Sequence, residues 1–104
     1  MQAKDPVLSR FRDGLSQIYG DRLDRVVLFG SRARGDADAN SDYAVAVFLK
    51  DMADRWAEFD RLVPLRVNFI ENYDADFMVL PFKDSDYGQQ TGLMYAVRTE
   101  GILL

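Results

Sequence analysis

Apolar residues fall on one stripe of a predicted helix over the first segment of the chain, from Asp5 to Tyr19. Asp5 can cap this helix, Pro6 suits its first turn, and Gly20 ends it. A short apolar run, Val26 to Phe29, follows between charged residues and a glycine. Such a run predicts a buried strand.

The rest of the pattern predicts a polar loop and four further elements. Residues 30–41, with the sequence GSRARGDADANS, are rich in Gly, Arg and Asp and predict a loop around a short helix. The later elements are a strand at Tyr43–Leu49, a mostly helical stretch at Lys50–Tyr73 that Pro64 kinks or divides, a strand at Ala75–Pro81 and a helix at Gln89–Thr99. This order indicates an α/β or α+β domain with a small sheet.

The length and the missing residue types narrow the chemistry. We expect the 104 residues to form one domain, 1–104. Without Cys there are no disulfides, thiolate zinc sites or cysteine nucleophiles, and without His there are no serine triads or imidazole metal sites. Catalysis must therefore use carboxylates, hydroxyls, Lys or Arg, together with a hard cation bound by oxygen, such as Mg²⁺.

Charge and hydropathy bear on the partners of the chain. Lys and Arg number 13 against 17 for Asp and Glu, a net charge of −4, which disfavours DNA or RNA as the main partner. No segment approaches the roughly 20 apolar residues of a membrane span, and the first residues lack the apolar core of a signal peptide. We therefore expect a cytoplasmic protein that does not contact membranes. A domain this small leaves apolar surface for a protein partner to cover.

The segment that joins the first two strands carries the candidate chemistry. Gly30 allows a tight turn, and Ser31 follows near a helix start, where free N–H groups and a hydroxyl can bind phosphate oxygens. Arg32 and Arg34 offer guanidinium groups to further phosphate charge. Asp42 opens the next strand and can hold a metal between itself and that phosphate.

The spacing of Gly30-Ser31, ten residues and Asp42 resembles the Gly-Ser-x10-Asp-x-Asp signature of the DNA polymerase β-like nucleotidyltransferase superfamily. Within that superfamily, GSRARG…SDY resembles the minimal nucleotidyltransferase (MNT) branch, small proteins commonly encoded beside a HEPN-domain toxin. The order of elements and a closing Arg-x-Glu-Gly at 98–101 extend the resemblance over nearly the whole chain. It implies a polymerase β palm-like fold, with helices and a small mixed β-sheet.

Ala44 departs from the signature, which has an aspartate at that position. Residues 42 and 44 of a strand point to one face about 7 Å apart, and two carboxylates so placed share a pair of divalent ions roughly 4 Å apart. By resemblance the third carboxylate, which helps to deprotonate the nucleophile, is Asp76, with Asp74 as its local rival. Ala44 is either an engineered replacement, which retention of the other motif residues favours, or a natural loss in an antitoxin that acts by binding. In both cases we expect little or no catalysis.

The resemblance implies a function for the parent enzyme. It transfers AMP from Mg²⁺-ATP to a Tyr hydroxyl of a cognate HEPN toxin and so neutralises the toxin. The implied nucleotide-binding residues are Gly30, Ser31, Arg32 and Arg34, and the implied metal ligands are Asp42 and Asp76, for two Mg²⁺ ions in the parent enzyme. A small-molecule acceptor such as an aminoglycoside is disfavoured, since the chain lacks a second substrate-binding domain. The alternative function is a non-catalytic antitoxin that neutralises its toxin by binding alone.

We expect a stable hetero-oligomer with a helical toxin, because in-line transfer requires an acceptor hydroxyl that the partner itself positions. An acidic rim favours basic residues near that acceptor; its members are Asp36, Asp38, Asp84 and Asp86. Plainer explanations remain for each motif: residues 30–41 as a polar surface loop, Asp42 as a turn cap and Asp76 as an ordinary residue at a strand start.

Overall fold

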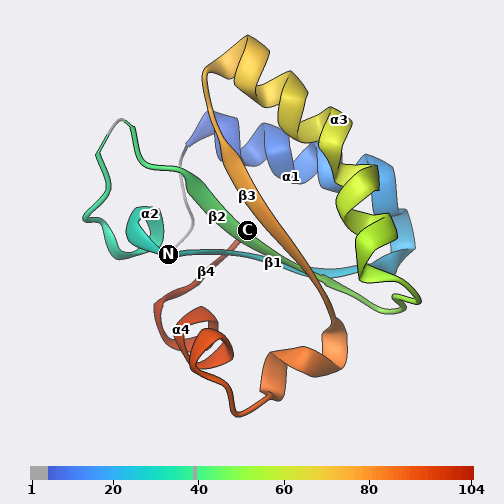
Figure 1. The fold of residues 1–104 in the computed structure, drawn as a ribbon. Helices are drawn as coiled ribbons and strands as arrows, with labels where there is room; N and C mark the ends of the chain where they lie inside the picture. The colour runs from blue at the N-terminus through green and yellow to red at the C-terminus, as the bar shows by residue number, and fades with distance from the viewer. Residues whose placement is uncertain (1–4, 39) are drawn as a thin grey trace.

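The computed structural model describes residues 5–38 and 40–104, in which four helices surround a four-stranded sheet (Figure 1). The helices are α1 (Pro6–Tyr19), α2 (Ser31–Arg34), α3 (Arg55–Tyr73) and α4 (Gly92–Glu100). The strands are β1 (Leu23–Phe29), β2 (Tyr43–Leu49), β3 (Phe77–Lys83) and β4 (Ile102–Leu103). Short 3₁₀ turns cover Gly20–Arg22 and Asp84–Gly88. The predicted α/β class is confirmed.

The sheet has the strand order β3-β2-β1-β4 and is mixed, as expected. β2 and β3 are parallel and joined by the α3 crossover, whereas β1 is antiparallel to both β2 and β4. Because β1 ends where β2 and β3 begin, Phe29 pairs with Ala44. One end of the sheet therefore collects Gly30, which follows β1, with Asp42 and Asp76, which precede β2 and β3.

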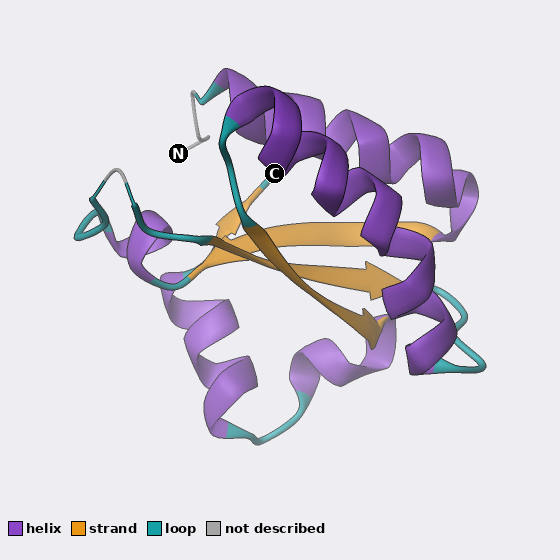
Figure 2. Ribbon diagram, turned by 45° about the horizontal axis from the view of Figure 1, so that its top comes forward, coloured by secondary structure: helices purple, strands orange, loops and turns teal. Residues whose placement is uncertain are grey.

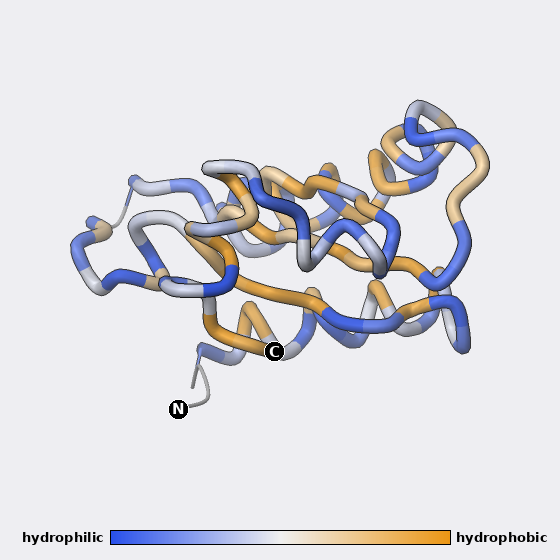
Figure 3. Tube along the Cα trace, turned by 90° about the horizontal axis from the view of Figure 1, so that it is seen from below, coloured by the Kyte–Doolittle hydropathy of each residue, from blue (hydrophilic) through white to orange (hydrophobic). Residues whose placement is uncertain are grey.

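Helices cover both faces of the sheet, α1 and α3 on one face and α4 with the 84–88 turn on the other (Figure 2). Alternate residues of β2 point to opposite faces of the sheet and pack against different helices. Val45 and Val47 pack beneath α1 and α3, whereas Ala46 and Phe48 pack beneath α4. The hydrophobic stretches of the chain accordingly run along the strands in the middle of the molecule (Figure 3).

Side chains from α3 cover the outer edge of β3. Arg66 donates to the carbonyl oxygen of Phe77 at 2.6 Å, and Arg55 donates to that of Pro81 at 3.1 Å. Pro81 has no N–H to offer another strand. An exposed strand edge is a template for pairing with further chains, and these contacts leave little of that template on β3.

α3 runs through Pro64 without a break, so of the two outcomes expected at that residue, a kink or a division, the division does not occur. Pro64 and Asp60 are both exposed, and the Asp60 carbonyl that loses its helical hydrogen bond can therefore bind water. The helix also begins later than expected, because the Asp54 side chain accepts a hydrogen bond from the Trp56 N–H at 3.0 Å and caps it.

Other element boundaries differ from the prediction by a few residues. β1 begins at Leu23 rather than Val26. Charged residues interrupt the apolar pattern in this first part of the strand, where the pairing with β2 is also irregular. β3 extends to Lys83, past the proline expected to close it, and α4 begins at Gly92 behind its cap Thr91. β4 was not predicted, because two residues carry no periodic pattern. Within the described ranges, no helix combines the length and apolar character needed to cross a membrane.

Candidate active site

A pocket of about 180 Å³ lies at the end of the sheet where β2 and β3 begin. Its lining comes from α2, from the loop before β2 and from the segment between α3 and β3: Arg32, Asn40, Ser41, Asp42, Asp74, Ala75 and Asp76. Three of these side chains are carboxylates, so the pocket is acidic and rich in oxygen. The fold therefore brings together three residues predicted for the site, Arg32, Asp42 and Asp76, although they come from three separate segments.

Asp42 and Asp76 are neighbours across the parallel strand pair. The N–H of Tyr43 donates to the carbonyl oxygen of Asp76 at 2.9 Å, and the ladder continues with Tyr43 opposite Phe77. The side chains of both aspartates are exposed and line the same pocket. A ligand in this pocket therefore meets a carboxylate from each of the two strand starts.

Asp74 lines the pocket as well, but it has a separate structural role. It caps the C-terminus of α3 in the left-handed conformation, with φ of 51°, and its N–H bonds the carbonyl of Phe69. Asp76 has no such backbone role. Its carboxylate lies 3.9 Å from the guanidinium of Arg66 on α3, which makes Asp76 the better candidate for a third catalytic carboxylate.

Gly30 turns the chain from β1 into α2 with φ of 76°, a conformation that glycine adopts without strain. A Cβ at this position would lie 3.5 Å from the Cβ of Ala44, so the turn passes directly beside β2. The Gly30 carbonyl accepts from the Arg34 N–H at 3.0 Å. The N–H groups of Ser31 and Arg32, at the start of α2, have no carbonyl within the helix to bind.

Two apolar side chains continue the face that carries the acids. Ala44 pairs with Met78 in the β2–β3 register, and each lies two residues beyond an aspartate of the pocket. Met78 is 43% exposed. The position at which the nucleotidyltransferase signature has its second aspartate therefore carries a methyl group beside a thioether.

Arg32 fixes the loop that precedes β2. Its Nε donates to the carbonyl of Ser41 at 2.9 Å, and its guanidinium lies 4.0 Å from the ring centroid of Tyr43. The Tyr43 hydroxyl donates to a carboxylate oxygen of Asp5 at 2.5 Å. Burial and this hydrogen bond raise the pKa of Tyr43 to about 12, so the phenol stays protonated. The wall of the pocket is thus tied to the N-terminus of α1.

Arg34, the other predicted phosphate ligand, does not line the pocket. It forms exposed ion pairs with Asp36 at 3.3 Å and with Glu100, at the end of α4, at 3.5 Å. Exposed pairs of this kind are weak, so Arg34 can exchange them for an anionic ligand at little cost.

Sequence reasoning missed Arg66. Its guanidinium bonds the Phe77 carbonyl and faces Asp76, but it lies within a charged helix ten residues before that aspartate. No motif marks such a position. The signal that could have found it is the α3 crossover itself, which returns the helix alongside the strand that it precedes.

The donor set suits one hard cation rather than two. Mg²⁺ usually binds one or two carboxylates and completes its shell with water and substrate phosphates, and Asp42 and Asp76 supply two carboxylates. Ala44 supplies none. Across residues 5–38 and 40–104, no group of three acidic side chains is arranged to hold a metal ion.

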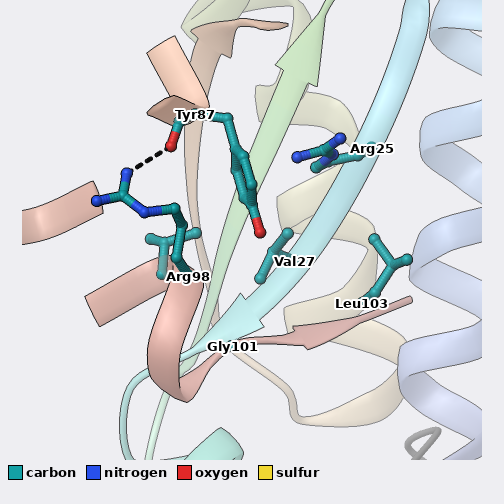
Figure 4. Close-up of a pocket in the computed structure, with 7 residues that line it drawn as sticks. Arg25, Val27, Tyr87, Arg98, Gly101 and Leu103 are labelled. Atoms are coloured by element: carbon teal, nitrogen blue, oxygen red, sulfur yellow. Dashed lines mark hydrogen bonds between the residues drawn. The ribbon is translucent and has the colours of Figure 1, made fainter. Parts of the chain in front are cut away.

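A second pocket, of about 360 Å³, lies between β1, α4 and the 84–88 turn (Figure 4). The guanidinium of Arg25 stacks 3.9 Å from the ring centroid of Tyr87. Arg98 donates to the carbonyls of Tyr87 and Gln89, at 2.6 Å and 3.0 Å. Both arginines thus hold the turn, and the described residues that line this pocket include no carboxylate. It lacks the groups expected for metal-assisted phosphoryl transfer.

Residues 8–96 match the family defined as the nucleotidyltransferase domain. The chain belongs to this family. Its matched range contains the Gly30 turn and the whole acidic pocket. Over 68 residues, 65% of this chain and 68% of the relative, the domain is 37% identical to a Methanocaldococcus jannaschii protein named "Putative protein adenylyltransferase".

Solved structures share the fold of this nucleotidyltransferase domain at lower identity. One is a toxin–antitoxin with AMP-PNP, with a TM-score of 0.64 and 23% identity over 90% of this chain and 69% of the other. Another is tri-AMPylated Shewanella oneidensis HEPN toxin in complex with MNT antitoxin, with a TM-score of 0.55 and 18% identity over 91% and 69%.

Proposed function

We propose that this nucleotidyltransferase domain is an MNT-type antitoxin of the cytoplasm, and that its acidic pocket binds Mg²⁺-ATP. In the form with aspartate at position 44, it transfers AMP to a Tyr hydroxyl of a HEPN toxin and so neutralises the toxin. The relative named "Putative protein adenylyltransferase" supports the reaction. Neighbours of the same fold that are toxin–antitoxin complexes, one with AMP-PNP and one with an AMPylated toxin, support the partner.

The observation that carries the proposal is the meeting of Asp42 and Asp76 in one pocket beside the Gly30 turn. Asp42 and Asp76 would hold a divalent cation, which supplies positive charge to the triphosphate. The Ser31 hydroxyl, the first N–H groups of α2 and Arg32 would bind phosphate oxygens.

The transfer exchanges one P–O bond for another. The tyrosine oxygen of the toxin attacks the α-phosphorus of ATP as the bond to pyrophosphate breaks. The tyrosine proton passes to a carboxylate oxygen of Asp76, which lies 3.9 Å from the guanidinium of Arg66. The partner must bring its hydroxyl into line with the bond that breaks, because in-line transfer requires the attacking oxygen to be held close to the α-phosphorus.

Ala44 makes the present chain a poor transferase. An aspartate at this position would point to the same face as Asp42, beside Gly30, and would complete the pair of carboxylates in the signature. With alanine, nucleotide binding remains because Ser31, Arg32 and Asp42 are unchanged.

The test is AMP transfer to purified HEPN toxin from labelled ATP with Mg²⁺, comparing this chain, Ala44→Asp and Ala57→Asp. Ala57 is an exposed alanine of α3, so its variant adds the same charge away from the pocket. We expect label on the toxin with Ala44→Asp alone. Toxin that binds the chain but stays unlabelled with Ala44→Asp would contradict the proposed transfer.

That contradictory outcome would support a second candidate, an antitoxin that acts by binding alone. The pairing of Ala44 with Met78 favours it, because an apolar face has replaced a metal ligand in the site. In that case this chain and its Ala44→Asp variant would inhibit the toxin equally, with or without ATP.

A further inference from the structure

Half of the large apolar side chains that are exposed in residues 5–38 and 40–104 lie on α3. They are Trp56, Val63, Val67 and Ile70, and Trp56 is 76% exposed. Phe59 lies against Trp56, with ring centroids 5.8 Å apart. α3 packs on the sheet through another face, which carries Leu62 and Phe69. These residues form what we call the α3 stripe: Trp56, Phe59, Val63, Val67 and Ile70.

The spacing of the α3 stripe is that of a helix which pairs with another helix. Trp56, Val63 and Ile70 repeat every seven residues, and Phe59 falls three residues after the first of them. Apolar residues at every a position and at the first d position form a seam on which another helix can pack, with Val67 beside the second d position, which is Arg66. A strand is a poor alternative partner here, because Arg55 and Arg66 bind the carbonyls of the neighbouring β3 edge.

The two borders of the stripe differ in charge. With about 100° of rotation per residue, Arg55 and Arg66 border the stripe on the β3 side, where both donate to β3 carbonyls. Asp60 and Glu71 border the other side, and neither forms an ion pair within the described ranges. The unmatched charge is therefore negative, and it fits a helix with Lys or Arg along the facing edge.

A second copy of this chain fits the stripe poorly. In an antiparallel dimer related by a two-fold axis, the acidic borders of the two stripes would lie against each other. In a parallel dimer they would meet Arg55 and Arg66, whose guanidinium groups are already bound to β3.

The stripe also leads to the acidic pocket. α3 ends at Tyr73, and the next residue, Asp74, lines the pocket together with Asp42 and Asp76. We infer that the α3 stripe is the docking surface for the toxin of the proposed function, which lays on it an amphipathic helix with apolar heptads and a basic edge. This inference rests on the proposed function, and it names the surface that holds the acceptor beside the pocket.

The test measures the affinity of purified HEPN toxin for the full chain and its variants by calorimetry. Trp56→Glu and Val63→Glu place a charge on the stripe, whereas Tyr95→Glu places one on an aromatic residue of α4 whose exposure, 64%, lies between those of Trp56 and Val63. We expect each stripe variant to weaken binding roughly 10-fold or more, and Tyr95→Glu to leave it unchanged. Glu71→Lys should weaken binding as well, and the difference should shrink in high salt. Circular dichroism checks that the variants are folded.

The outcomes separate this inference from the proposed function. If the toxin binds the chain and both stripe variants equally, the docking surface lies elsewhere and the inference fails while the proposed function stands. If the toxin does not bind the chain at all, both fail. Sedimentation of the chain alone as a dimer that Val63→Glu dissociates would assign the stripe to a second copy and overturn the inference.

Discussion

Ala44 and Met78 lie side by side in the parallel register of β2 and β3, on the face that carries Asp42 and Asp76. This pairing places two uncharged side chains two residues beyond the aspartates of the pocket. We therefore expect the charge at residue 44 to change how strongly the pocket attracts a cation with its nucleotide, and this dependence can be measured.

The first prediction is that this chain binds Mg²⁺-ATP, but more weakly than Ala44→Asp does. Loss of a group around a metal commonly costs about 10- to 100-fold in affinity, and we expect a difference of that order. Calorimetry in millimolar Mg²⁺ measures it, with Ala57→Asp as the control for added charge. If neither this chain nor Ala44→Asp binds ATP, the proposed phosphate-binding site is wrong.

The second prediction concerns Asp42. In the Ala44→Asp background, Asp42→Asn should abolish AMP transfer without lowering the melting temperature, because the exposed Asp42 side chain contributes little to packing. Transfer assays and thermal melts on the same preparations test it. Transfer at the parental rate would show that Asp42 holds no metal.

The third prediction separates Asp76 from Asp74. In the same background, Asp76→Asn should abolish transfer, whereas Asp74→Asn should retain it. Asn tolerates the left-handed conformation that residue 74 adopts, so the second variant keeps the helix end. Equal loss in both variants would mean that the third carboxylate cannot be assigned to Asp76 alone.

The fourth prediction concerns stability at low pH. Glu58 is 4% exposed and accepts hydrogen bonds from Arg22 and Arg61, each at 3.1 Å. Burial alone would raise the pKa of Glu58, but the hydrogen bonds and positive charge of its neighbours, Arg22 foremost, together outweigh burial and lower that pKa. The stabilisation is therefore complete above the unfolded-state pKa, about 4.3, and is lost as the pH falls through the lower folded-state value.

Glu58→Gln should accordingly lower the free energy of unfolding by about 1–3 kcal/mol at pH 7, and by less at pH 3. Urea unfolding at the two pH values measures the difference. Glu71→Gln, an exposed change on the same helix, is the control. A loss of equal size at both pH values would rule out the ion pairs as its cause.

Much of the fold was predictable because local patterns marked it. Apolar runs located β2 and the core of β1, and the cap at Asp5 with the glycine at 20 bounded α1. The prediction failed where the surroundings of a segment in the fold outweigh its local signals. Pro64 remains inside α3 because its side of the helix faces water, and β4 exists only through its pairing with β1.

The candidate site was predictable to the extent that a motif spans it. Gly30 and Asp42 belong to one motif, and the structure places Asp76 in the same pocket as Asp42. The different contacts of Arg32 and Arg34 were not predictable, because both are arginines of the same short polar segment. Only the fold turns Arg32 to Tyr43 and Arg34 to Glu100.

The outer edge of β3 is covered by Arg55 and Arg66 and contains Pro81, which limits where further strands can pair with this sheet. Strand exchange or fibre-like stacking on that side would have to displace two guanidinium groups and to pair with a residue that has no donor. On the opposite side, the two-residue strand β4 pairs with Val27 and Leu28 of β1, and the Leu104 N–H donates to the Val26 carbonyl at 2.9 Å. Misassembly of this protein under heat or destabilising mutation is therefore directed to the β4 side.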